Sequence, residues 1–168
     1  SLWDDSLAAR ILPILGDLSR PLLGLSAEKF EELAGQVDVI YHNGALANFI
    51  YPYRTHKAPN VLATQEALRL ACRVKLKPVH FVSTLDVFHT GHDQTDSTYF
   101  ENCDLDEIGV PFGGYAQSKW VGEKLMAIAA ARGIPTAVYR PGSVTGDSRT
   151  GAWNTGDIIC SLAKASVT

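Results

Sequence analysis

Four short, continuous apolar runs constrain the fold of this chain more than any other feature. They occupy residues 11–17, 37–43, 79–84 and 136–142, and they are rich in valine, isoleucine and aromatic residues. Uninterrupted apolar character is typical of parallel strands that are buried on both faces of a sheet. We therefore expect four parallel strands.

The segments between these runs have helical character. Residues 26–35, 58–74 and 115–133 form three such segments, and the third ends at Gly133, which is a good C-cap residue. The order is strand, helix, strand, helix, strand, loop, helix, strand. It predicts an α/β fold with a Rossmann-like, doubly wound parallel sheet. We expect residues 1–168 to form a single, partial domain.

The composition excludes several classes of protein. Hydrophobic residues make up 46% of the chain and charged residues 20%, which is typical of a globular protein. A net charge of -3 gives no general attraction to nucleic acid or to an anionic membrane, and no apolar run approaches the ~20 residues of a membrane helix. The three cysteines lie far apart, which favours a reducing, cytoplasmic location. His89, His92 and Asp93 have metal-like spacing, but we interpret them as a solvated loop and predict no metal.

Two tyrosine–lysine pairs have a spacing of four residues. Tyr53 and Lys57 lie between two prolines, so they need not share a helical face. Tyr115 and Lys119 begin a long predicted helix, where residues four apart lie on the same face. A long polar loop, residues 89–114, precedes this pair, and loops of that length are often functional. We therefore favour the second pair as a chemical site.

The expected site lies at the carboxyl edge of the sheet, where small or polar residues follow each apolar run. A free tyrosine has a pKa near ~10, and a nearby Lys119 ammonium would lower it. Tyr115 would then act as a general acid toward an oxygen that gains charge during hydride addition. Thr84 would hydrogen-bond the same oxygen, and Lys119 would reach toward a cofactor ribose.

Several segments resemble one family. "YAQSKW", "FVSTLDVF" and "RPGSVTGD" resemble the extended short-chain dehydrogenase/reductase superfamily. "ILGDLSRPLLGLS", "VDVIYHNGALANFIYPY", "NVLATQEALRLA" and "GAWNTGD" narrow the resemblance to the thioester reductase domains of nonribosomal peptide synthetases, carboxylic acid reductases and α-aminoadipate reductases. These segments follow the family's order over nearly the whole chain.

The resemblance implies a role for each matching residue. Thr84, Tyr115 and Lys119 would form the catalytic triad. The positions implied for the cofactor, in addition to Tyr115 and Lys119, are Asp17, Leu18, Asn43, Gly44, Ala45, Asn60, Ser83, Pro141, Gly142, Ser143 and Val144. The positions implied for the substrate are Asp86, Trp153 and Asn154.

The implied function is NADPH-dependent release of an acyl or peptidyl thioester, held on the phosphopantetheine of a carrier protein, as an aldehyde. A second reduction would give an alcohol. The alternatives are another extended member, such as a fatty acyl-CoA reductase or a sugar-nucleotide epimerase or dehydratase, and a non-catalytic docking domain. The chain lacks the family's Gly-rich loop. We therefore expect it to miss the first strand–helix–strand unit and most of the substrate subdomain, and to be inactive alone.

Overall fold

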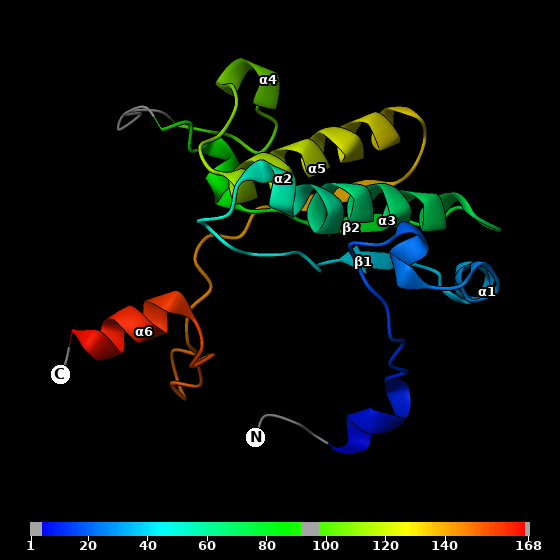
Figure 1. Cartoon of the computed structure of the whole chain (residues 1–168), viewed down its shortest axis with the longest axis horizontal. Coiled ribbons are helices and arrows are strands. Elements are labelled where there is room, and N and C mark those ends of the chain that lie inside the picture. The colour runs from blue at the N-terminus through cyan, green and yellow to red at the C-terminus, as the bar shows by residue number, and fades with distance from the viewer. Residues whose placement is uncertain (1–4, 92–97, 167–168) are drawn as a thin grey trace.

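A three-stranded parallel sheet forms the centre of the computed structural model, which describes residues 5–91 and 98–166 (Figure 1). The strands are β1 (Ile40–His42), β2 (Val79–Val82) and β3 (Thr136–Tyr139), in the spatial order β1-β2-β3. Residues Tyr41 and His80 are in register, as are Phe81 and Val138. The sheet confirms the predicted Rossmann-like α/β class.

Helices connect the strands. The α-helices are α1 (Ala27–Gln36), α2 (Tyr53–His56), α3 (Ala63–Cys72), α4 (Leu105–Ile108), α5 (Gly114–Ala131) and α6 (Ile158–Ala165). The other helical segments are η1 (Asp5–Arg10), η2 (Pro21–Gly24), the π-helical η3 (Lys57–Leu62) and η4 (Leu85–Phe88). The predicted ends of two helices are confirmed. Ser26 caps α1 by accepting a hydrogen bond from the Lys29 N–H, and Gly133 adopts a φ of 91° just after α5.

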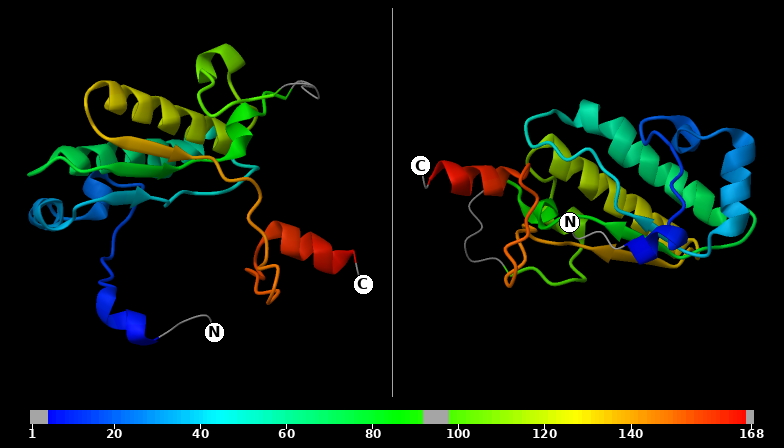
Figure 2. Two further views of the ribbon diagram at one scale, coloured as in Figure 1. Left: turned by 180° about the vertical axis from the view of Figure 1, so that it is seen from behind. Right: turned by 90° about the horizontal axis from the view of Figure 1, so that it is seen from below.

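One face of the sheet carries the core. Helices α3 and α5 cover this face, whereas α6 and the N-terminal segment stand away from the sheet on its other side (Figures 1 and 2). Ala71 of α3 and Met126 of α5 pack with Val79 and Phe81 of β2. Gly122 permits this close packing, because a Cβ atom there would lie 2.6 Å from Cζ of Phe81.

The opposite face of the sheet carries an aromatic ladder. The ring of His80 stacks on Tyr41 at a centroid distance of 4.4 Å and on Tyr139 at 5.8 Å. Tyr41 and Tyr139 are exposed. The expectation that the strands are buried on both faces is therefore wrong for this face, because no helix of the described residues covers it.

The first apolar run is not a strand, so the prediction of four strands is wrong. Residues 11–17 are irregular, and Leu12 and Leu15 are 77% and 95% exposed. A strand needs a neighbour for its backbone hydrogen bonds, and no strand of the described residues pairs with this run. Pro13 also lacks an N–H donor.

The helix after β1 begins earlier than predicted. The chain is helical from Tyr53 to Cys72, and the Lys57 N–H donates to the Tyr53 carbonyl. The flanking prolines therefore do not keep Tyr53 and Lys57 out of one helical stretch. The widened π-helical turns of η3 accommodate Pro59, because a residue without an N–H cannot close an ordinary turn.

Candidate active site

Two strands and their following loops are tied together at the carboxyl edge of the sheet. The Ser83 N–H donates to the Tyr139 carbonyl at 2.7 Å, and the Leu85 N–H donates to the Pro141 carbonyl at 3.1 Å. These bonds continue the strand pairing beyond β2 and β3. The edge is the expected position of a ligand in an open α/β sheet.

Tyr115 lies in the first turn of α5, at this edge. Its half-buried ring contacts Phe49 edge-on at a centroid distance of 5.5 Å and His56 at 6.1 Å. Burial raises the pKa of the Tyr115 hydroxyl, and the negative charge of Asp86 raises it further. The hydroxyl is therefore protonated at neutral pH and can donate a proton.

Lys119 is turned toward the sheet rather than toward the tyrosine hydroxyl. Its Nζ donates to the Val82 carbonyl at 2.7 Å and lies 4.9 Å from the centre of the Phe81 ring. Burial lowers the pKa of Lys119 to about 8, although the carboxylate of Glu123 opposes this shift. The expectation that Lys119 lowers the pKa of Tyr115 is wrong in this structure. The ammonium is held by a carbonyl of β2, and desolvation together with Asp86 dominates at the phenol.

Thr84 and Ser83 follow β2 and have different surroundings. Thr84 is half-buried, and its Oγ1 accepts a hydrogen bond from the Asp86 N–H at 3.2 Å, which leaves its own hydroxyl hydrogen able to donate. Ser83 is buried, and its Oγ has no hydrogen-bond partner among the described residues. A buried hydroxyl without a partner is unusual and marks a position that a ligand can satisfy.

Asn60 is a buried cross-link between the loop after β1 and α5. Its side-chain oxygen accepts from the Leu46 N–H at 2.7 Å, and its Nδ2 donates to the Leu46 carbonyl and to Ser118 Oγ. Ser118 Oγ in turn donates to the Tyr115 carbonyl at 2.7 Å. Both the oxygen and the nitrogen of the Asn60 side-chain amide therefore have protein partners. Through these bonds Asn60 positions the loop and the start of α5.

The other residues predicted to bind the cofactor form the exposed rim of the edge. Asn43 and Gly44 are exposed after β1, and a Cβ atom on Gly44 would lie 2.8 Å from Cδ1 of Leu18. Asp17 closes the turn before η2 by accepting from both the N–H and the hydroxyl of Ser19. Ala45 and Pro141 are half-buried, whereas Gly142, Ser143 and Val144 are exposed. Gly44 is thus packed against Leu18, and the unpartnered Ser83 hydroxyl is the feature of this edge that fits a bound dinucleotide.

The three residues predicted to contact the substrate do not gather at one place. Asp86 lies beside Tyr115 in a cavity of about 190 Å³ that also includes Phe49, His89 and Phe112. Trp153 packs against Gly146 of its own loop. The two residues are so close that a Cβ added to Gly146 would lie 3.3 Å from the Trp153 Cβ. Asn154 accepts from the Gly156 N–H in the turn before α6. The structure thus brings Asp86 to Tyr115 and shows no contact of Trp153 or Asn154 with this cavity.

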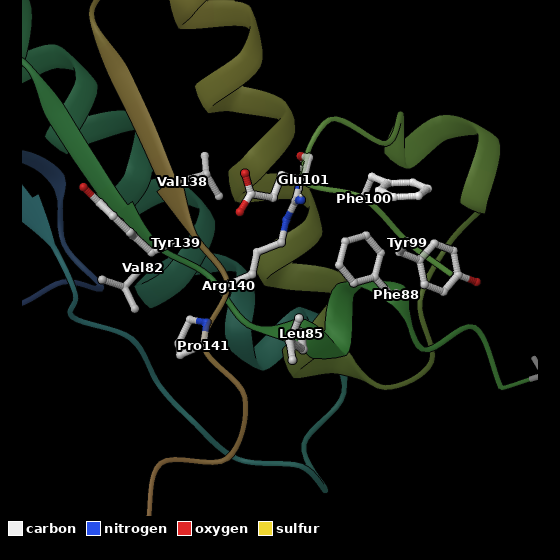
Figure 3. Close-up of a pocket in the computed structure, with 10 residues that line it drawn as sticks. All are labelled: Val82, Leu85, Phe88, Tyr99, Phe100, Glu101, Val138, Tyr139, Arg140 and Pro141. Atoms are coloured by element: carbon white, nitrogen blue, oxygen red, sulfur yellow. Dashed lines mark hydrogen bonds between the residues drawn. The ribbon is translucent and has the colours of Figure 1, made fainter. Parts of the chain in front are cut away.

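A second cavity, of about 860 Å³, is lined by residues of β2, η4 and β3 and by the segment before α4 (Figure 3). Arg140 crosses it and forms an ion pair with Glu123, and its guanidinium lies 5.0 Å from the centre of the Phe88 ring. Sequence reasoning missed this pair and the aromatic walls of both cavities. For the ion pair, the sequence offered one signal: Glu123 lies one helical turn after Lys119 and therefore on the same face of the predicted helix.

The described residues contain neither a cluster of metal ligands nor a membrane-spanning helix. Within residues 5–91 and 98–166, no three histidine, cysteine or acidic side chains are grouped in a way that could hold a metal ion. His92 and Asp93, which have metal-like spacing in the sequence, lie outside these residues. In the same part of the chain, no helix has the length and apolar character that a membrane crossing requires.

A parallel α/β sheet with a threonine after β2 and a tyrosine and a lysine on α5 is typical of the extended short-chain dehydrogenase/reductase class. The chain belongs to the family of NAD-binding domains described as Male sterility protein, which matches residues 1–168. This finding confirms the class that the sequence motifs predicted.

Known relatives include reductases and multidomain synthetases. The chain is 49% identical over 162 residues to a linear gramicidin synthase of Brevibacillus parabrevis, covering 96% of this chain and 3% of that protein. It is 38% identical to L-2-aminoadipate reductase of Saccharomyces cerevisiae, covering 98% of this chain and 13% of the relative. The crystal structure of the terminal R domain from the myxalamid PKS-NRPS pathway matches with a TM-score of 0.92 and 51% identity, over 99% of this chain and 42% of that domain. The chain therefore spans less than half of each of these proteins.

Proposed function

We propose that the protein containing this chain uses NADPH to reduce an acyl or peptidyl thioester on the phosphopantetheine of a carrier protein, and that it releases an aldehyde. The observation that carries the proposal is Tyr115, a half-buried, protonated phenol at the carboxyl edge of a sheet of this family, whose pKa responds to Asp86, two residues after Thr84. The kinship with a gramicidin synthase and a myxalamid R domain supports a carrier-bound substrate.

The proposed chemistry depends on two proton donors. When bound, NADPH supplies the hydride that is added to the carbonyl carbon of the thioester. Tyr115 and Thr84 donate hydrogen bonds to the carbonyl oxygen as its charge grows, and the Tyr115 proton is transferred to it. The resulting hemithioacetal then breaks its carbon–sulfur bond. Its hydroxyl proton passes by way of Tyr115 to the departing sulfur, which gives an aldehyde and a free thiol, and a proton from solvent restores the Tyr115 phenol.

The remaining residues would hold and orient the reactants. Asn43, Gly44 and Ser83 would contact the cofactor at the edge, and Lys119 would reach its ribose after leaving the Val82 carbonyl. Asn60 fixes the start of α5 through Ser118 and thereby holds Tyr115 in place.

A substitution at Tyr115 tests this proposal. Tyr115→Phe keeps the ring but removes the proton donor, so we expect kcat for NADPH oxidation with an acyl-loaded carrier protein to fall by about 100-fold or more. The assay uses the complete reductase domain, and NADPH binding should be unchanged. Tyr53→Phe is the matched control, because Tyr53 belongs to the other tyrosine–lysine pair and should retain activity.

Other outcomes would favour the alternatives. Wild-type activity in Tyr115→Phe would refute the role of this tyrosine. Strong inhibition by a nucleoside diphosphate sugar, without thioester turnover, would favour a sugar-nucleotide enzyme. A complete domain that neither binds nor oxidises NADPH would favour a docking function.

A further inference from the structure

The cavity beside Tyr115 is small and has a defined chemical character. Its lining includes the rings of Phe49 and Phe112, the side chains of Asp86 and His89, and Tyr115. Its volume of about 190 Å³ suits a group of about six heavy atoms, since a water molecule occupies roughly 30 Å³. A group bound in this cavity would lie next to Tyr115.

The walls of the cavity are fixed by hydrogen bonds. The Phe112 N–H donates to the His89 carbonyl at 2.7 Å, which joins the end of η4 to the segment before α5. The Asp86 N–H is held by Thr84 Oγ1. On the opposite side, Asn48 Oδ1 accepts from the Ile50 and Tyr51 N–H groups at 2.9 and 3.0 Å, which fixes the turn that carries Phe49. The cavity is therefore preorganised.

The charge of Asp86 has no ion-pair partner among the described residues. Within residues 5–91 and 98–166, the Asp86 carboxylate makes no ion pair and accepts no hydrogen bond. The two cations near the site are engaged elsewhere, because Lys119 donates to the Val82 carbonyl and Arg140 is paired with Glu123. The field of Asp86 nevertheless reaches the Tyr115 hydroxyl, whose pKa it raises.

Exposed aromatic rings complete the site. Phe49 is 64% exposed and Phe112 is 72% exposed, although both are large apolar side chains. Aromatic rings around a carboxylate attract an ammonium ion through cation–π contacts and direct ion pairing. An anionic acyl group would be repelled, and a purely apolar group would remove water from Asp86 without replacing it.

We propose that this cavity selects acyl groups that carry a protonated amine next to the thioester carbonyl, such as an aminoacyl group with a free amino group. This inference rests on the proposed thioester reductase function and adds the chemical class of its substrate. An ammonium bound at Asp86 also offsets the negative field at Tyr115, which makes the phenol a better acid when the correct substrate is present.

The test compares two thioesters of equal shape on the carrier protein. The alanyl group carries an amine where the isobutyryl group carries a methyl. With the complete reductase domain, we expect kcat/KM to be about tenfold or more higher for the alanyl substrate. In Asp86→Asn the alanyl-to-isobutyryl ratio should fall by about tenfold or more, equivalent to about 1.4 kcal/mol. Asp38→Asn is the matched control, because Asp38 is an exposed carboxylate before β1 that pairs with Lys75, and it should keep the wild-type ratio.

Each outcome has a distinct meaning. Equal ratios in the wild type and in Asp86→Asn would overturn the inference while leaving thioester reduction intact. If Asp86→Asn does not fold, the wild type decides alone, because equal turnover of both substrates would refute selection for the amine. A wild type that reduces neither thioester would refute the proposed function itself, and the inference with it.

Discussion

The buried ion pair between Arg140 and Glu123 offers a quantitative test of the packing around α5. Arg140 Nε lies 3.1 Å from both carboxylate oxygens of Glu123, and Nη2 lies 2.7 Å from Oε2. The side chain of Glu123 is only 3% exposed. Arg140 also donates to the Glu101 carbonyl at 3.1 Å and covers Phe88, so it links β3, α5 and the loop before α4.

Removal of the arginine should be far more damaging than removal of both charges. Arg140→Met keeps much of the side-chain length but leaves a buried carboxylate without a partner, which destabilises proteins by about 3–5 kcal/mol. Replacement of both partners by methionine removes the stranded charge. The double variant should therefore be more stable than Arg140→Met by about 2 kcal/mol or more.

Urea unfolding of the complete domain measures these differences. A loss of about 3 kcal/mol corresponds to a decrease of about 1–3 M in the urea midpoint. Arg132→Met is the matched control, because Arg132 is exposed at the end of α5 and its replacement should change stability by about 0.5 kcal/mol or less. The reasoning is refuted if Arg140→Met unfolds within about 1 kcal/mol of the wild type, or if the double variant is no more stable than the single one.

Two further predictions concern pH and packing. Burial, together with the charge of Lys119, lowers the pKa of His42 from 6.5 to about 4. The unfolded chain therefore binds a proton between these pH values that the folded chain does not, and stability should fall by about 3 kcal/mol as the pH decreases from 6.5 to 4. His42→Gln should flatten this part of the unfolding profile; an unchanged slope would contradict the assignment. Gly122→Ala should destabilise the fold by about 1–3 kcal/mol in urea, because its Cβ would lie 2.6 Å from Phe81. Gly35→Ala in α1, which has open space, should instead be neutral or stabilising by up to ~1 kcal/mol, and equal effects at both glycines would refute the packing argument.

The sequence predicted the architecture where local pattern and tertiary context agree. Ser26 and Gly133 mark helix ends through backbone geometry that depends on neighbouring residues alone. The apolar runs at β1, β2 and β3 became strands because each pairs with a neighbour. The run at 11–17 is apolar as well and failed as a strand, because pairing is not a local property.

For the candidate site, too, the sequence predicted some features and the tertiary structure decided others. Residue types, spacing and position identified Tyr115, Lys119 and Thr84 as candidates, because proton donation to a carbonyl oxygen needs such groups at the end of a strand and the start of a helix. The family resemblance added Asp86. Where Lys119 points was decided by the tertiary structure, since the Val82 carbonyl that holds it lies 37 residues away in the sequence. The direction of the Tyr115 pKa shift was decided likewise, because burial and the field of Asp86 depend on how η4 packs against α5.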